Sequence, residues 1–550
     1  MTAEDFGARI AAAYAADGSS VDIGRALLDG TCFPEAVVRV PTAMCNRHGL
    51  IAGATGTGKT VTLQLLAEQL SAQGVPVFAA DIKGDLSGLV KPAAPNEKIQ
   101  ARIGELQLEY TPSGSPVQFW ALGGQGPGVP IRASIGSFGP ELLSKVLGAN
   151  ETQSSSLSLV FHYADKQSLP LLDLVDLTDL LKYLISDDGK VELKTIGGLS
   201  SQTAGVLLRK MVELEQQDAE LFFGEPEVSL DHLIRLAPDG RGVINCLELS
   251  AVQDRPKLFS TFLMWMLANL FEHLPEVGDL EKPKLVFFFD EAHLLFNGAS
   301  KDFIEQVAQT VRLIRSKGVG VFFVTQLPDD VPDAVLAQLG NRIQHGLRAY
   351  TPRDAKALKA AVTTYPKTDD YDLEEVLTQL GIGEAVVTTL TDRGVPTPVA
   401  WTRIRPPESQ IGAVDPVEIK TMAESSDLWA TYAAEVDRES AREMLAKKMG
   451  AGDPAVSAVG PPSPARPDLP PPPVAPAPAP SPGDLVRDSG IDDGSFDTPA
   501  PRQRPAAKKP APKTAKADGN AVTDFLKTRE GRSTVNTVLR GVFSLLKKSR

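Results

Sequence analysis

Residues 53–60, Gly-Ala-Thr-Gly-Thr-Gly-Lys-Thr, have the spacing G-x-x-x-x-G-K-[ST]. They follow a short apolar run at 49–52 and precede residues 61–72, where apolar side chains recur at helical spacing. Glycines in such a loop let successive backbone N–H groups point at phosphate oxygens, and the helix N-terminus adds positive potential. Lys59 then reaches the β- and γ-phosphates, and the Thr60 hydroxyl binds Mg²⁺. The motif predicts a site for ATP and Mg²⁺ formed by Gly53, Ala54, Thr55, Gly56, Thr57, Gly58, Lys59 and Thr60.

A second group of residues is acidic and directly follows the apolar run 285–289. If this run is a buried strand, it delivers Asp290 to the sheet edge at which phosphates lie, where the carboxylate can hold Mg²⁺ through water. Glu291 is then placed to polarise a water for attack on the γ-phosphate. A carboxylate directly after the metal-binding aspartate favours hydrolysis over transfer to a substrate hydroxyl. We expect His293 to be structural.

Further polar residues follow other apolar runs. Gln326 ends the run 319–325 and can sense the γ-phosphate or orient the attacking water; a simple polar strand end is the alternative. Asp81 and Asp85 follow the run 75–80 and can serve a similar site. Four arginines are candidates to reach the nucleotide of a neighbouring subunit: Arg312, Arg315, Arg342 and Arg348. For any one of them, a position near a helix C-terminus or on the solvated surface is the default interpretation.

The fold class follows from the alternation of these segments. Near-continuous apolar runs at 49–52, 75–80, 285–289 and 319–325 alternate with helical periodicity, as at 301–316. Such strands are typical of a parallel sheet covered on both faces. We therefore predict an α/β protein with a P-loop ATPase core.

The core is predicted to be discontinuous. Residues 1–45 form a helix and strand lead-in, 46–90 and 241–410 form the two parts of the core, 91–240 form an inserted, mainly helical subdomain, and 411–450 form a helical extension. Of 43 prolines, 18 lie between Asp453 and Pro512, so 451–520 reads as a disordered Pro/Ala-rich linker. Residues 521–550 carry apolar side chains at helical spacing and many basic ones.

Charge is divided unevenly along the chain. Residues 1–450 carry 41 Lys and Arg against 59 Asp and Glu, whereas residues 501–550 carry 13 against 3. The acidic body argues against a protein that coats nucleic acid through its whole surface. It also offers the basic C-terminal helix a surface to dock on; a partner, an anionic membrane and nucleic acid are the alternatives.

Composition excludes several other classes. Mean hydropathy is −0.08, and no apolar run approaches the ~20 residues of a membrane span. The N-terminus shows no secretory signal. The three cysteines form no C-x-x-C pair, so neither a disulfide framework nor a structural zinc site is expected. A reducing, cytoplasmic setting fits these features.

Five stretches of the chain resemble the HerA-like ATPase/helicase family, in particular its bacterial YjgR-type branch. They are NRHGLIAGATGTGKT (46–60), ADIKGDLSGL (80–89), KPKLVFFFDEAHLLF (282–296), RLIRSKGVGVFFVTQLPDDVPDAVLAQLGNRIQHGLRAYTPRD (312–354) and GEAVVTTLTDRGVPTPV (383–399).

This resemblance implies a RecA-like core and a relationship to ring-forming DNA pumps such as FtsK and to conjugative coupling ATPases. It implies that Lys59 and Thr60 bind phosphate and Mg²⁺ and that Asp290 and Glu291 are the Walker B pair. It further implies that Gln326 is the sensor and that an arginine within 312–348 acts in trans, with Arg315 our first choice and Arg348 our second. A hexameric ring acting on DNA is the corresponding expectation.

The chain departs from the resemblance at one point. HerA proper has an N-terminal β-barrel that docks a nuclease, and only about 50 residues precede the phosphate loop here, which argues against a nuclease partner. No helix-turn-helix or zinc-finger motif is evident. Two functions remain open: a DNA translocase or helicase, and an ATP-driven switch or assembly ATPase that acts on a protein or membrane-associated partner.

Overall fold

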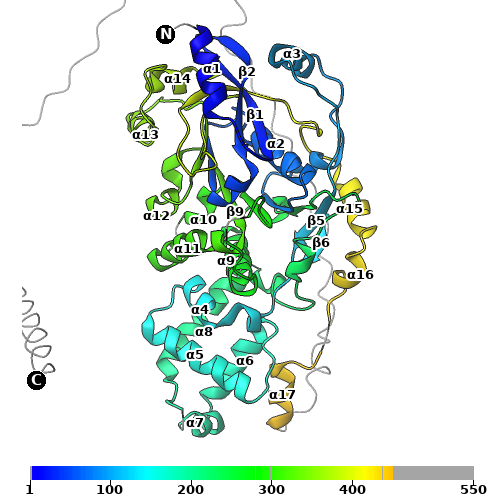
Figure 1. The fold of residues 1–550 in the computed structure, drawn as a ribbon. Coiled ribbons are helices and arrows are strands. Elements are labelled where there is room, and N and C mark those ends of the chain that lie inside the picture. Colours follow the sequence, from blue (N-terminus) through cyan, green and yellow to red (C-terminus); the bar gives the residue numbers. More distant parts are fainter. Residues whose placement is uncertain are drawn as a thin grey trace, which may run out of the picture. The chain divides into compact units, whose positions relative to one another are not determined.

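The computed structural model describes residues 3–449, apart from 195, 217, 279, 298, 299 and 437. The linker predicted over 451–520 and the basic helix predicted over 521–550 lie outside this part of the chain. Within it, helices and strands alternate along much of the sequence (Figure 1). None of the described helices combines the length and apolar character that crossing a bilayer requires.

The described strands form one 12-stranded sheet, in the order β2-β1-β12-β11-β10-β3-β9-β8-β4-β7-β5-β6. Neighbours from β10 to β6 pair in parallel, and those from β2 to β10 pair antiparallel. The strands are β1 (Ser20–Leu28), β2 (Thr31–Pro41), β3 (Gly49–Ala52), β4 (Val77–Asp81), β5 (Val117–Leu122), β6 (Val129–Ile131), β7 (Ile244–Glu248), β8 (Leu285–Phe289), β9 (Val319–Thr325), β10 (Asn341–His345), β11 (Glu384–Thr388) and β12 (Ala400–Ile404). The predicted α/β class with a largely parallel sheet is confirmed.

Helices lie beside the sheet and beyond it at both ends of the view (Figure 1). They are α1 (Ala3–Ala13), α2 (Lys59–Ala72), α3 (Glu97–Leu106), α4 (Ile135–Val146), α5 (Glu151–Lys166), α6 (Leu174–Leu184), α7 (Asp187–Leu193), α8 (Ser201–Glu215), α9 (Pro256–His273), α10 (His293–Phe296), α11 (Lys301–Ile314), α12 (Asp333–Leu336), α13 (Pro352–Thr363), α14 (Leu373–Gln379), α15 (Pro416–Glu424), α16 (Trp429–Tyr432) and α17 (Ala441–Lys448).

The central strands are apolar throughout because both faces of the sheet are buried. In β8, Leu285, Phe287 and Phe289 belong to one hydrophobic core, which includes residues of α9 and α11. Val286 and Phe288 belong to the opposite core, which includes residues of α1 and α2. Alternate side chains of one strand therefore serve two cores, as the two-residue period of a strand requires.

The segment predicted as a helical insert, 91–240, contributes strands as well as helices. Residues Val117–Leu122 form β5, which pairs in parallel with β7, and Val129–Ile131 form β6 at the sheet edge. The apolar residues 117–122 are flanked by Gly/Pro-rich stretches, so the sequence pattern there does not indicate a strand. The helices α4–α8 follow and pack on one another (Figure 1).

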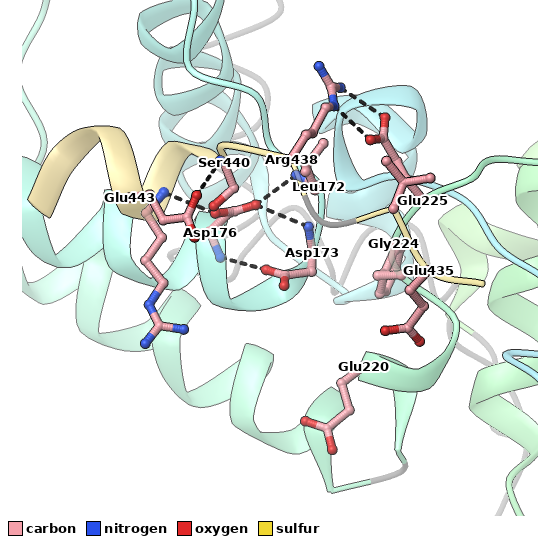
Figure 2. Close-up of a pocket in the computed structure, with 13 residues that line it drawn as sticks. Leu172, Asp173, Asp176, Glu220, Gly224, Glu225, Glu435, Arg438, Ser440 and Glu443 are labelled. Atoms are coloured by element: carbon pink, nitrogen blue, oxygen red, sulfur yellow. Dashed lines mark hydrogen bonds and ion pairs between the residues drawn. The ribbon is translucent and has the colours of Figure 1, made fainter. Parts of the chain in front are cut away.

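The extension after residue 411 is tied to the helical part of the insert. Arg438 donates two hydrogen bonds to the Glu225 carboxylate, at 2.6 and 2.9 Å. The buried Asp176 carboxylate of α6 accepts from the backbone N–H of Arg442, at 3.0 Å. These contacts border a hollow of about 540 Å³ whose lining includes Glu220, Glu435 and Glu443 (Figure 2).

Candidate functional site

The phosphate loop connects β3 to α2. The Gly53 N–H donates to the Thr325 carbonyl at the end of the adjacent strand β9, at 3.2 Å. Gly53, Gly56 and Gly58 all have positive φ, and a Cβ on Gly53 would lie 2.5 Å from the Cβ of His345, so a larger residue there would clash. Helix α2 begins directly after Gly58, which directs its N-terminus at the loop.

The Lys59 ammonium lies inside this loop. It donates to the carbonyls of Gly53 at 2.7 Å and Ala54 at 3.1 Å, and the residue is 6% exposed. Burial lowers the pKa of Lys59, while the neighbouring Glu291 carboxylate acts in the opposite direction. A cation held in a ring of backbone groups, with no side-chain acceptor in these contacts, is suited to take phosphate oxygens as partners.

A neutral histidine braces the start of α2. His345, at the end of β10, is fully buried; its Nε2 lies 2.9 Å from the Thr62 hydroxyl and its Nδ1 lies 2.9 Å from the Glu384 carbonyl. Burial lowers the pKa of His345 to about 4, so the ring is uncharged at neutral pH. The contact fixes α2 against β10 and β11.

The acidic pair lies at the end of β8, as the sequence predicts. Asp290 is 4% exposed, and its Oδ1 accepts from the Glu291 N–H at 2.9 Å. Its Oδ2 is buried and has no hydrogen-bond partner among the residues that the structure describes. Burial raises the pKa of Asp290 to about 6, against the effect of the Lys83 ammonium. Glu291 has a φ of 48°, which is uncommon for a residue with a Cβ and indicates a constrained backbone at this position.

Lys83, which sequence reasoning passed over, anchors Glu291. Its ammonium lies 2.5 Å from Glu291 Oε1, while Nδ1 of His293 lies 3.2 Å from Oε2. Oε2 itself makes no hydrogen bond in the described part of the chain. Burial acts to raise the pKa of Glu291, but Lys83 holds it below its usual range, so the carboxylate is ionised at neutral pH. One oxygen is therefore fixed and the other is available to a water.

Asp81 builds the turn that presents Lys83. Its carboxylate is fully buried and accepts from the backbone N–H groups of Lys83, Gly84 and Leu86, at 3.2, 2.8 and 2.8 Å. The turn also carries Asp85, whose Oδ1 is buried and finds no hydrogen-bond partner within residues 3–449 as described. Burial raises the pKa of Asp85, whereas the Lys83 ammonium and a hydrogen bond with Thr60 act to lower it.

These groups fit a divalent cation. Asp290 and Asp85 each present a buried carboxylate oxygen that no described residue hydrogen-bonds. Asp85 also interacts with Thr60, the predicted metal ligand of the loop. Oxygen donors of this kind are those that Mg²⁺ uses. The residues that would hold the metal are thus Thr60 and Asp290, with Asp85 beside them.

The remaining predicted residues fall in two places. Gln326 and Arg348 line a hollow of about 530 Å³ together with residues 54–57 of the loop. Arg348 is held there by donating to the carbonyls of Thr378 at 2.6 Å and Leu380 at 3.4 Å. Arg315 precedes β9, so it lies at the sheet edge opposite to the phosphate loop, which follows β3 in the parallel register.

Comparison with known proteins gives one family match. The sequence model described as "Helicase HerA-like C-terminal" matches residues 29–463, which is most of the chain.

Two curated relatives come from Methanocaldococcus jannaschii. The probable helicase MJECL08 is 24% identical over 358 residues, which cover 62% of this chain and 64% of the relative. The probable helicase MJ1565 is 22% identical over 355 residues, covering 62% of this chain and 60% of the relative. The matched region therefore spans less than two thirds of either relative.

Similar solved structures include a bacterial conjugative coupling protein and a VirB4 protein. The conjugative coupling protein TrwB, in its unbound monoclinic form, gives a TM-score of 0.49 at 17% identity, covering 74% of this chain and 93% of that one. VirB4 of Thermoanaerobacter pseudethanolicus gives a TM-score of 0.44 at 16% identity, covering 70% and 97%.

Proposed function

The chain belongs to the HerA-like helicase C-terminal family, and on that premise we propose that it is an ATP-hydrolysing motor that moves DNA. One observation carries the hydrolysis part of this proposal. Lys83 fixes one carboxylate oxygen of Glu291, and the other makes no hydrogen bond to any residue that the structure describes, in the site that also contains Lys59 and Asp290. An ionised, oriented carboxylate beside a phosphate loop suits a general base for water.

The roles of the side chains follow from their charges. Lys59 and the backbone N–H groups of the loop neutralise the phosphates. Glu291 takes a proton from the attacking water as the water adds to the γ-phosphorus, and the bond from that phosphorus to the β–γ bridging oxygen breaks, so that ADP leaves with that oxygen. Thr60 and Asp290 would hold Mg²⁺, which would supply neutralisation of phosphate charge. Gln326 is proposed to orient the water, because it lines the same hollow as residues 54–57.

Two substitutions separate binding from hydrolysis. Lys59→Ala removes the charge that holds the phosphates and should abolish ATP binding measured by calorimetry. Glu291→Gln keeps the shape and removes the base, so it should bind ATP like the wild-type protein and lose hydrolysis by about 100-fold or more. Hydrolysis by Glu291→Gln at the wild-type rate would remove Glu291 from its role.

We further propose that the active form is a ring, with hexamers as the expected size. Arg315 is the better candidate for action in trans, because it lies at the sheet edge away from its own phosphate loop, whereas Arg348 lines the hollow beside its own loop. An arginine that completes a neighbour's site stabilises charge on the transferring phosphoryl group.

A second function is favoured by charge. Residues 1–450 carry 59 acidic against 41 basic side chains, and the hollow bordered by Glu225 and Arg438 is lined by further carboxylates (Figure 2). Such a surface repels a phosphate backbone. An ATP-driven switch that acts on a protein partner without DNA is the alternative, and it predicts an ATPase activity that DNA leaves unchanged.

A further inference from the structure

A buried glutamate lies beside the turn that presents Lys83. Glu248 ends β7 and is 2% exposed, and it pairs with Asp81 in the parallel register of β7 and β4. We propose that Glu248 is a positioning residue for hydrolysis, whose neutral carboxyl group donates a hydrogen bond to the Asp81 carboxylate and so holds the turn. The inference rests on the proposed function, because the turn acts through Lys83 on the base Glu291.

The Glu248 carboxyl group lies between its own strand and the turn. Cys246, two residues earlier on the same face of β7, places its Sγ 3.5 Å from Glu248 Oε1. The other oxygen, Oε2, faces Gly84 of the turn, because a Cβ on Gly84 would lie 3.7 Å from it. One oxygen each of Asp81 and Glu248 and the Cys246 Sγ all lie within 4.8 Å of one another. Glu248 is therefore next to both the Asp81 carboxylate and the backbone that this carboxylate organises.

Two buried carboxyl groups this close hold a proton between them. Burial raises the pKa of Glu248 to about 7, and burial together with the Glu248 carboxylate raises the pKa of Asp81. Asp85 is a further acid near the pair and acts in the same direction on both. Asp81 accepts from three backbone N–H groups of the turn, which stabilise its ionised form. The proton of the pair therefore belongs on Glu248, which makes Glu248 a donor.

The position of the Asp81 carboxylate matters for the catalytic end of the site. The Lys83 N–H donates to Asp81 Oδ1, and the Lys83 ammonium reaches Glu291 Oε1 at 2.5 Å. A shift of the Asp81 carboxylate therefore moves the stem of the lysine that anchors the base. The strand ends themselves are joined independently, because the Leu249 N–H donates to the Asp81 carbonyl at 2.9 Å. Replacing the Glu248 side chain should thus disturb the turn and leave the pairing of β4 and β7 in place.

Two substitutions of similar shape test this role, Glu248→Met and Glu248→Gln. Both fill the space of the glutamate, but only glutamine can donate to Asp81. Glu248→Met should lower kcat about tenfold and leave the KM for ATP and the affinity for ADP within about threefold, because only the base is misplaced. Glu248→Gln should keep kcat within about threefold of wild type. The matched control is Glu68→Met, the same change at another buried glutamate whose pKa burial raises to about 7, and it should leave kcat within about twofold.

A double-mutant cycle with Lys83→Met tests the route of the effect. If Glu248 acts through Lys83, adding Glu248→Met to Lys83→Met should lower kcat by less than about twofold. Two independent effects would multiply instead, and the double variant would then lose a further factor of about ten.

Each outcome supports or overturns a defined part of the proposal. Wild-type protein that does not hydrolyse ATP contradicts the proposed ATPase and the positioning role with it. Wild-type protein that hydrolyses ATP, together with Glu248→Met protein of equal kcat, overturns the positioning role alone. Loss of ADP affinity in parallel with kcat would assign Glu248 to the general stability of the site, and a Glu248→Gln variant as slow as Glu248→Met would exclude the hydrogen-bond donor. Multiplying effects in the cycle would exclude the route through Lys83.

Discussion

Replacing Lys83 by methionine should slow hydrolysis without weakening nucleotide binding. Lys83 touches Glu291 Oε1 at 2.5 Å, and this contact is an anchor of the proposed base. Methionine has similar length and removes the charge. Glu291 would then be free to rotate away from the water it must deprotonate.

The expected magnitude follows from what the anchor does. General-base catalysis contributes about 10²–10⁴-fold, and misplacing a catalytic group by about 1 Å can remove 100-fold. His293 remains 3.2 Å from the other carboxylate oxygen and retains part of the orientation. We therefore expect kcat to fall about 10- to 100-fold, or roughly 1.4–2.7 kcal/mol in the barrier. The affinity for ADP should stay within about threefold.

Steady-state hydrolysis in a double-mutant cycle measures this coupling. Lys83→Met should lower kcat in the wild-type background and have no further effect in the Glu291→Gln background. The acidic limb of the kcat profile should also move to higher pH, because Lys83 lowers the pKa of Glu291. Lys91→Met is the control: it removes a lysine whose exposure is similar to that of Lys83 and whose ammonium lies 2.6 Å from the Glu418 carboxylate. Lys83→Met protein that hydrolyses ATP at the wild-type rate would refute the reasoning.

Three further predictions concern the frame of the site and its assembly. Ser409→Ala should lower the free energy of unfolding by about 1–3 kcal/mol in urea titrations, because the buried Glu68 carboxylate loses a donor; an unchanged midpoint would contradict this. Burial raises the pKa of Glu68 from 4.5 to about 7. The neutral form of Glu68 therefore contributes up to about 3 kcal/mol to the free energy of unfolding. This contribution is fully present below pH 4.5 and is lost as the pH rises through 7. Between pH 5.5 and 8, the melting temperature of Glu68→Gln should therefore fall less than that of the wild-type protein. An equal fall in both proteins would argue against the raised pKa of Glu68. Mixing Arg315→Ala subunits with Lys59→Ala subunits should restore part of the hydrolysis that each variant lacks. Full activity of each variant on its own as a monomer, or a mixture without activity, would contradict action in trans.

The phosphate loop and the end of β8 could be predicted because their signals are local. The pattern of Gly53 to Thr60 lies within eight residues, and Asp290 follows an apolar run directly. The positive φ of the loop glycines explains why that pattern needs them. The strands at 285–289 and 319–325 have the bounds that the sequence predicts, because each apolar run is limited by polar or glycine residues.

Other parts depend on contacts between distant residues and carry no local signal. Lys83 meets Glu291 across 208 positions, and His345 meets Thr62 across 283. The acids of DIKGD (81–85) drew attention, while the lysine between them is the residue that touches the proposed base. Arg102 lies in a segment predicted to be an insert, yet it hydrogen-bonds to Gly383 and Ile404 beside the loop.

The rate of ATP hydrolysis with and without DNA tests the central claim most directly. Wild-type protein should hydrolyse ATP, and duplex or single-stranded DNA should stimulate it, at least several-fold, while Glu291→Gln stays inactive in every condition. Activity that neither form of DNA changes would contradict a DNA motor and support the switch that acts on a protein partner. No hydrolysis in any condition would contradict the ATPase itself.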